Sequence, residues 1–323
     1  MKTVRRAVID VGTNSIKLLV ADVAGDQIQP VWEGSKQTRL GSGFYPNRRL
    51  LTTAITQSAG VVAEFAAEAR KQEAASIRII ATSAAREAIN AKELIDAIER
   101  EARLKVEILS GEEEADLVFE GVSTDSAMAK DPLLLLDVGG GSTEFILGQG
   151  HHKTFRASFP LGSVRLLETL PLSDPPSHKE LIACRTEVRE FLRTLVQPSL
   201  APNLIAAAPF TPLLVGTGGT VTILARMEAQ MQDFDRQEIE KMRLSLDRLK
   251  WHVQHLWSLP LEQRKTVIGL PANRADVILT GSVIFEAVME SFRFSELRVS
   301  TRGLRFAALR PSAMANAKAS NAF

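Results

Sequence analysis

The feature that most constrains the fold of this chain is an internal repeat. Residues 134–147 (LLLDVGGGSTEFIL) can be laid on residues 7–20 (AVIDVGTNSIKLLV) without a gap. Both stretches have an apolar strand, a polar turn and a second apolar strand, the pattern of a β-hairpin. Because internal repetition reflects architecture, the sequence predicts two similarly built α/β halves, each opening with a hairpin. The identical residues are Asp10, Val11, Gly12 and Ser15 in the first stretch and Asp137, Val138, Gly139 and Ser142 in the second.

The repeat also suggests how the chain divides into domains. The boundary falls in the polar segment 124–131 (TDSAMAKD), so we expect domains over residues 1–125 and 126–310. Residues 311–323 (PSAMANAKASNAF) are small and polar, and we expect a disordered tail there. Apolar residues at helical spacing predict the main helices. These should cover residues 52–74, 84–103, 178–197, 245–258 and 274–291.

The composition narrows the classes of partner. There are 39 Lys and Arg against 38 Asp and Glu, and this net charge of +1 argues against nucleic-acid binding, which relies on a basic surface. The single cysteine excludes an intramolecular disulfide and fits a reducing compartment. The longest uncharged window, 194–225, is interrupted by prolines and glycines and cannot be a membrane helix. We therefore expect a cytoplasmic protein without a membrane span, with a homodimer as one candidate assembly.

Three turns that contain glycine follow apolar strands. Glycines at strand ends let the backbone approach a ligand closely, and consecutive amide N–H groups there can hold phosphate oxygens. The third turn also opens a helix, whose N-terminus favours an anion. No turn has the Gly-Lys-[Ser/Thr] ending of a P-loop or the spacing G-x-G-x-x-G. The predicted phosphate-binding residues are Gly12, Thr13, Asn14 and Ser15, then Gly139, Gly140, Gly141 and Ser142, and finally Gly216, Thr217, Gly218, Gly219 and Thr220.

Carboxylates accompany the first two turns. Asp10 and Asp137 each end an apolar run directly before a glycine turn, where a carboxylate is costly unless it is paired or bound to a cation. Glu144 lies across the second turn and would face the same point if the hairpin closes there. Mg²⁺ usually takes one or two protein carboxylates together with water and phosphate oxygens. The set predicts a site for Mg²⁺ or another divalent cation, against the plainer alternative of turn-capping acids.

The segment 110–116 (SGEEEAD) is the densest acidic cluster. Ser110 and Glu113 have the spacing of a capping box, and acids suit the first turn of a helix. This leaves Glu114 without a structural explanation. If water is the nucleophile of a reaction, a general base must come from such a group. The spacing alone does not choose between these acids.

The sequence also leaves two roles open for several basic residues. Arg86 follows a predicted strand-to-helix junction and suits bidentate contact with phosphate. A lone arginine on a helix, however, is more often a solvated surface group. The same two alternatives, phosphate contact or a solvated surface position, apply to Arg274, Arg302 and Arg305. The histidines show no third ligand that would complete a zinc site.

These stretches together resemble the exopolyphosphatase/guanosine pentaphosphate phosphohydrolase (Ppx/GppA) phosphatase family, in collinear order over about residues 5–310. The resemblance implies an α/β protein with duplicated ribonuclease-H-like domains of the actin/sugar-kinase/chaperone-ATPase fold and an interdomain cleft. The matching stretches are AVIDVGTNSIKLLVAD (7–22), ATSAAREAIN (81–90), ILSGEEEADLVFEGV (108–122), LLLLDVGGGSTEFILG (133–148), PLGSVRLLE (160–168), VGTGGTVT (215–222), RADVILTG (274–281) and VSTRGLR (299–305).

The resemblance also implies an activity. Family members hydrolyse the terminal phosphate of inorganic polyphosphate, or the γ-phosphate of pppGpp, with Mg²⁺. Inorganic polyphosphate or guanosine penta- or tetraphosphate is therefore the expected partner. The family's catalytic base is the glutamate directly before the alanine of its Ser-Gly-x-Glu-Glu-Ala element, which is Glu114 here. By the same resemblance Arg86 and the glycine turns contact phosphate, and Asp137 and Glu144 lie near the metal. We expect Asp10 to join these two carboxylates in holding Mg²⁺ through water.

Two departures from the family pattern qualify this expectation. The chain has no counterpart of the C-terminal helical module of long members, so we expect a short, two-domain form. The last matching element continues as Phe306-Ala307, where the family usually has Glu-Gly. Two other functions stay open. One is an ATP-dependent kinase of the same fold, and the other is a guanosine tetraphosphate sensor with little turnover.

Overall fold

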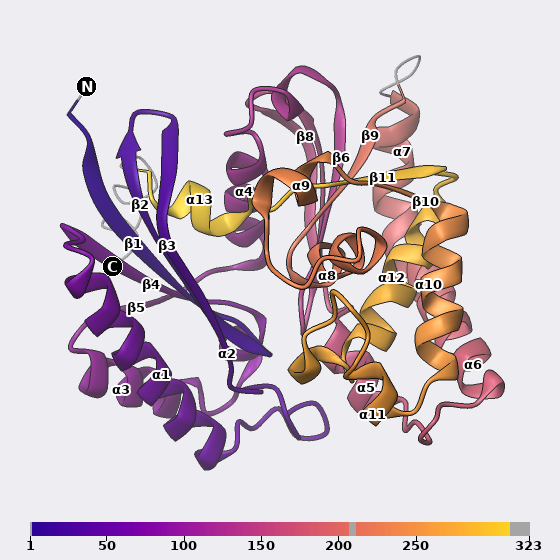
Figure 1. The fold of residues 1–323 in the computed structure, drawn as a ribbon, viewed down its shortest axis with the longest axis horizontal. Helices are drawn as coiled ribbons and strands as arrows, with labels where there is room; N and C mark the ends of the chain where they lie inside the picture. The colour runs from indigo at the N-terminus through magenta and orange to yellow at the C-terminus, as the bar shows by residue number, and fades with distance from the viewer. Residues whose placement is uncertain (1, 207–210, 311–323) are drawn as a thin grey trace. The chain divides into compact units, whose positions relative to one another are not determined.

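The structure is a computed structural model that describes residues 2–206 and 211–310. It consists of two compact units (Figure 1): unit 1 runs to Ser126 and resumes at Arg302, and unit 2 is Ala127–Thr301. The chain first passes from unit 1 to unit 2 after Ser126, one residue beyond the expected boundary. The expected end of the second domain at residue 310 needs correction, because residues 302–310 belong to unit 1. The predicted tail, 311–323, lies outside the described residues.

Unit 1 is built on a mixed five-stranded sheet. The strand order is β3-β2-β1-β4-β5, in which β1, β2 and β3 are antiparallel neighbours and β4 and β5 run parallel to β1. Figure 1 shows α1 and α3 side by side next to this sheet. The elements are β1 (Val4–Val11), β2 (Ser15–Ala24), β3 (Gln27–Gln37), α1 (Thr52–Lys71), β4 (Ser76–Ala81), α2 (Ser83–Glu87), α3 (Ala91–Ala102), β5 (Val106–Ile108), α4 (Gly111–Val122) and α13 (Leu304–Ala308).

Unit 2 contains a six-stranded sheet in the order β10-β11-β9-β6-β7-β8. Its strands are β6 (Leu133–Val138), β7 (Thr143–Gln149), β8 (His152–Phe159), β9 (Leu213–Thr217), β10 (Arg243–Ser245) and β11 (Glu296–Val299). Its helices are η1 (Met128–Lys130), α5 (Ser163–Thr169), α6 (His178–Phe191), the π-helical η2 (Leu192–Val196), α7 (Gln197–Ala206), α8 (Gly219–Glu228), α9 (Arg236–Lys241), α10 (Leu246–Ser258), α11 (Leu261–Arg264), η3 (Ala272–Arg274) and α12 (Ile278–Ser291).

The two sheets share one topology. In unit 2 the strands β8-β7-β6-β9-β11 repeat the order and the directions of β3-β2-β1-β4-β5, and β10 adds an antiparallel edge strand. Three antiparallel strands followed by two parallel ones form the ribonuclease-H-like arrangement. The duplicated α/β fold class expected from the repeat is therefore confirmed.

Each unit has its own apolar core. In unit 1, α1 buries Val62 and Phe65, and α3 buries Leu94, in one cluster with Ile9 of the sheet. In unit 2, α12 is apolar on nearly all sides and is buried from Ile278 to Met289. Such a helix is typical of the interior of a large domain. No helix of the described ranges is long and apolar enough to cross a membrane.

The C-terminal helix α13 explains why residues 302–310 belong to unit 1. Phe306 of α13 is buried, and the helix packs against α4 and β1. A Cβ atom on Gly121 of α4 would overlap the carbonyl group of Gly303, so the two backbones touch there. The predicted domain boundaries followed the order of the chain, whereas residues 302–310 pack against unit 1.

One predicted helix is divided. The spacing predicts one helix over 84–103, but α2 ends at Glu87 and α3 begins at Ala91. Between them, the side chain of Asn90 accepts from the amide of Leu50 at 2.9 Å and donates to its carbonyl at 3.1 Å. A side chain that pairs with distant backbone competes with helix formation, and this contact is not visible in the local pattern.

Candidate active site

The first two glycine turns are closed in the same way. Between β1 and β2, the amide of Gly12 donates to the carbonyl of Ser15 at 3.1 Å, and between β6 and β7 the amide of Gly139 donates to the carbonyl of Ser142 at 2.9 Å. A Cβ atom on either glycine would lie 3.0 Å from that carbonyl oxygen. Both turns therefore favour glycine, and the sequence repeat is also a repeat of backbone geometry.

The second turn directs three consecutive amides to one side. The carbonyl groups of Gly139, Gly140 and Gly141 all accept hydrogen bonds from the start of α5. Because the C=O and N–H of one trans peptide point in opposite directions, the amides of Gly140, Gly141 and Ser142 point away from α5. Amides arranged in this way bind anions. The donors are Ser163 N to Gly139 (3.0 Å), Val164 N to Gly140 (2.8 Å) and Arg165 Nε to Gly141 (2.8 Å).

The first turn is supported in a similar manner by the loop after β3. The carbonyl of Thr13 accepts from the amide of Gly41 at 2.7 Å, and that of Asn14 accepts from the amide of Arg39 at 3.0 Å. The amides of Asn14 and Ser15 therefore point away from this loop. The buried Nδ2 of Asn14 has no hydrogen-bond partner among the described residues. An unpaired buried donor costs about 1–3 kcal/mol, so this turn fits an acceptor such as a phosphate oxygen.

The third turn lies between two charged side chains. Gly218 has φ +90°, and a Cβ atom there would overlap Oδ1 of Asp137. A Cβ atom on Gly219 would lie 3.2 Å from Nη2 of Arg274. A carboxylate and a guanidinium group thus flank the two glycines that open α8. A helix N-terminus together with an arginine favours an anion.

The outer members of the third turn have packing roles instead. A Cβ atom on Gly216 would lie 2.9 Å from the ring of Phe285. Thr217 is buried, and the Thr220 side chain packs against Gly281 of α12. Of the five predicted residues, Gly218 and Gly219 would bring a Cβ atom against charged side chains, and Thr217 lies beside Asp137 in the β6–β9 register.

Asp137 and Glu144 are directly opposed. They are partners in the β6–β7 register, so their side chains lie on the same face of the hairpin. Glu144 is 1% exposed, and its Oε1 accepts from the hydroxyl of Ser158 at 2.7 Å. Adjacent carboxylates repel unless a cation or a proton lies between them. This donor pair fits Mg²⁺ with water and phosphate oxygens as the remaining ligands.

A larger ligand set is absent from the described ranges. No group of three or more His, Cys, Asp or Glu side chains within residues 2–206 and 211–310 could hold a metal ion. The Asp137–Glu144 pair is therefore a smaller donor set than three such ligands.

Asp10 has a different partner. The residue opposite Asp10 in the β1–β2 register is Lys17. Burial raises the pKa of Asp10, and the positive charges of Lys17 and Arg305 oppose this shift. Arg305 comes from α13, and its Nη2 lies 3.4 Å from the carboxylate of Glu33. Because two cations already act on Asp10, it fits a metal ligand less well than the carboxylate pair of unit 2.

The three glutamates of the acidic cluster have different environments. Glu112 is exposed, and Glu113 closes the expected capping box by accepting from the amide of Ser110 at 2.8 Å. Glu114 is buried, and its Oε2 accepts from Nη1 of Arg86 at 2.9 Å. The structure thus brings the two predicted catalytic residues together and separates Glu114 from its neighbours.

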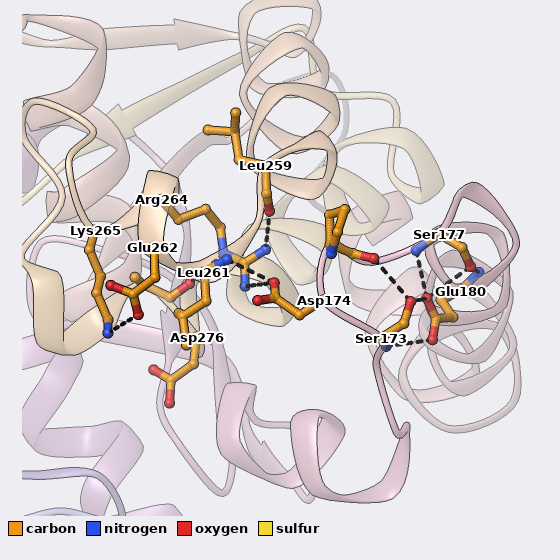
Figure 2. Close-up of polar contacts among 12 residues, drawn as sticks. Ser173, Asp174, Ser177, Glu180, Leu259, Leu261, Glu262, Arg264, Lys265 and Asp276 are labelled. Atoms are coloured by element: carbon orange, nitrogen blue, oxygen red, sulfur yellow. Dashed lines mark hydrogen bonds and ion pairs between the residues drawn. The ribbon is translucent and has the colours of Figure 1, made fainter.

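The segment that carries Arg274 is held by a second, buried arginine. Arg264 is 4% exposed, and its Nε donates to the carbonyl of Ala275 at 3.0 Å. Figure 2 shows its guanidinium reaching the carbonyl of Leu259, at 2.6 Å, and the carboxylate of Asp174, at 3.8 Å. The sequence left Arg274 open and did not single out Arg264, because the signal of a buried guanidinium exists only in the folded chain.

Glycine turns at equivalent strand ends of two ribonuclease-H-like units are typical of proteins that bind phosphate. The chain belongs to the Ppx/GppA phosphatase family, whose family model matches residues 19–309. Membership in this family makes it a phosphatase.

Individual relatives span almost the whole chain. Exopolyphosphatase 2 of Mycobacterium tuberculosis is 33% identical over 303 residues, which cover 91% of this chain and 92% of the relative. The crystal structure of an exopolyphosphatase from Cytophaga hutchinsonii superposes with a TM-score of 0.85 at 25% identity, covering 97% of this chain and 98% of that one. The Ppx/GppA family member of Aquifex aeolicus has a TM-score of 0.78 at 28% identity, covering 98% and 99%.

Proposed function

We propose that this protein is a phosphoanhydride hydrolase that releases the terminal phosphate of inorganic polyphosphate, with the γ-phosphate of pppGpp as the alternative substrate. The observation that carries the proposal is the buried carboxylate of Glu114 held by Arg86. A general base must be fixed within reach of the water that it deprotonates. The exopolyphosphatases among the relatives support polyphosphate as the substrate.

Both units contain residues suited to this chemistry. In unit 1, Glu114 takes the proton of the attacking water, and Arg86 fixes the orientation of its carboxylate. In unit 2, the amides of Gly140 and Gly141 and the guanidinium of Arg274 hold phosphate oxygens by charge and hydrogen bonding. Phosphoryl transfer depends mainly on positioning and electrostatic stabilisation, and these groups provide both.

Asp137 and Glu144 would hold the divalent cation in this proposal. When bound, Mg²⁺ supplies positive charge that stabilises the phosphate oxygens as charge shifts during transfer. The support is the opposed register of the two carboxylates. The cation, the cytoplasmic location and a homodimer stay predictions.

The test compares Glu114→Gln with Glu112→Gln, which changes an exposed glutamate on the same helix turn. Because general-base catalysis contributes about 10²–10⁴-fold, Glu114→Gln should lower kcat on polyphosphate by at least about 10²-fold with unchanged thermal stability. Glu112→Gln should retain nearly full turnover. Near-normal phosphate release by a folded Glu114→Gln protein would contradict the proposal.

The same assay separates the alternatives. Phosphate release is measured with polyphosphate, with pppGpp and with ATP, the last with and without sugar or acid acceptors. Transfer from ATP that requires an acceptor would indicate the kinase. Tight binding of guanosine tetraphosphate without hydrolysis of any of these substrates would indicate the sensor.

A further inference from the structure

The loop between β3 and α1 concentrates positive charge beside the first turn. Between Glu33 and Glu64 the chain has no acidic residue, although it contains Lys36, Arg39, Arg48 and Arg49. Lys36 pairs with Glu64 at 2.6 Å and Arg49 pairs with Glu93 at 2.7 Å, so the excess charge of the loop comes from Arg39 and Arg48. In a chain with a net charge of +1, this is a local excess of positive charge. Local excess of one sign attracts ligands of the opposite sign, whatever the total charge of the protein.

Two arginines of this loop have an unusual backbone. Arg39 and Arg48 have φ values of 49° and 54°, in the left-handed region that residues with a side chain seldom adopt. Both side chains are exposed. Strained backbone of this kind persists where the surrounding structure fixes it, and it is enriched at ligand sites.

The backbone of each arginine is fixed to an element of the candidate site. The amide of Arg39 bonds to the carbonyl of Asn14 in the first turn. The carbonyl of Arg48 accepts from the amide of Ile89 at 3.0 Å, just after α2, the helix that carries Arg86. Because α2 has five residues, it spans about 7.5 Å. Both arginines therefore start close to the predicted phosphate contacts, and Figure 1 shows the loop beyond the end of β3.

Unpaired buried groups mark the junction of the loop and the turn. The amide of Thr38 donates to the carbonyl of Asn14 at 3.2 Å. The hydroxyl of Thr38, a residue that is 2% exposed, and Nδ2 of Asn14, which is 6% exposed, both lack a hydrogen-bond partner among the described residues. Two adjacent polar groups without partners indicate a missing ligand or water rather than a packing role.

We propose that Thr38, Arg39 and Arg48 form a subsite for the phosphates that follow the terminal one, and so select a polyphosphate chain over a shorter substrate. This rests on the proposed function. The two guanidinium groups contact phosphate oxygens. The Thr38 hydroxyl and Nδ2 of Asn14 donate hydrogen bonds to the innermost phosphate oxygens, directly or through one water. Arginine is suited to this task because its planar donors match phosphate geometry.

The first test is kinetic. Arg39→Gln, Arg48→Gln and the double variant are compared with Arg103→Gln, which changes another exposed, left-handed arginine of unit 1 that lies near the opposite, N-terminal end of β5. The double variant should raise KM for long-chain polyphosphate at least about tenfold, since it removes two charged hydrogen-bond donors. Its kcat should change less than about twofold. Equal KM values for the double variant and Arg103→Gln would overturn the subsite.

The second test does not depend on turnover. Calorimetry with tripolyphosphate, without a divalent cation, should show weaker binding to the double variant and a smaller dependence of affinity on salt. Thr38→Val should also weaken this binding, while raising the thermal stability of the free protein because an unpaired buried hydroxyl is removed. Loss of stability with unchanged binding would show a purely structural role. If wild-type protein binds tripolyphosphate through these residues but hydrolyses nothing, the proposed function fails and the subsite stands.

Discussion

Lys17 and Glu144 occupy equivalent positions in the two hairpins. Each lies directly opposite the aspartate that precedes its glycine turn, Lys17 opposite Asp10 and Glu144 opposite Asp137. One hairpin therefore pairs an acid with a base, and its repeat pairs two acids. The duplication has kept the backbone of the hairpin and changed the charge of the residue opposite the aspartate.

This difference predicts where a divalent cation binds. Glu144→Gln removes one carboxylate of the opposed pair and should weaken Mn²⁺ binding at least about tenfold in calorimetry. Asp10→Asn changes a carboxylate that already lies beside Lys17, and should alter Mn²⁺ affinity much less. An equal loss of affinity in the two variants would show that both hairpins bind the cation.

Arg86 should act through Glu114. Its Nη1 is shared between the carboxylate of Glu114 and the carbonyl of Leu109, at 2.9 and 2.8 Å. Arg86→Ala should lower kcat by about 10²-fold, because the base loses its charged, oriented partner. Added guanidinium ions should restore part of the rate, whereas sodium at equal ionic strength should not. A rate that guanidinium leaves unchanged would argue against this orienting role.

Gly218 should be intolerant of a side chain. Its φ is +90°, and a Cβ atom would overlap the carboxylate of Asp137. Gly218→Ala should cost about 1–3 kcal/mol of unfolding free energy and reduce activity by displacing Asp137. Gly60→Ala is the matched control, since a Cβ atom there meets nothing within 4 Å. Because Gly60 lies in the interior of α1, Gly60→Ala should raise the unfolding free energy by up to about 1 kcal/mol. Urea unfolding of both variants measures the difference.

Stability should fall as the pH drops below about 6.5. His252 is buried, its Nε2 lies 2.7 Å from Glu228, and its Nδ1 has no partner in the described structure. Burial lowers the pKa of His252 from 6.5, although Glu228 opposes the shift. Below pH 6.5 the unfolded chain takes up a proton that the folded one does not, so unfolding becomes easier by up to about 1.4 kcal/mol per pH unit.

Two variants check this pH dependence. His252→Gln should remove most of the slope of unfolding free energy between pH 6.5 and the lower pKa of the folded protein. His178→Gln, which changes an exposed histidine at the start of α6, should keep the wild-type slope. Glu228 contributes to the pH dependence of stability only at lower pH, because Arg248 and His252 hold its pKa below 4.5. An unchanged slope in His252→Gln would assign the effect to other groups.

The sequence alone determined the features that depend on neighbours along the chain. The repeated hairpins, the capping box at Ser110 and the glycines that close the first two turns are all local, and the structure has them as expected. Local patterns are legible because period, capping and turn geometry involve residues only a few positions apart.

Only the tertiary structure decided which charged groups meet. Strand register placed Lys17 opposite Asp10, and burial distinguished Glu114 from Glu112. Packing from distant segments returned residues 302–310 to unit 1 and brought Arg274 to the third turn. Such pairings depend on contacts between residues far apart in the chain. Spacing therefore indicated which residues could serve the site, and folding determined which of them have the partners to do so.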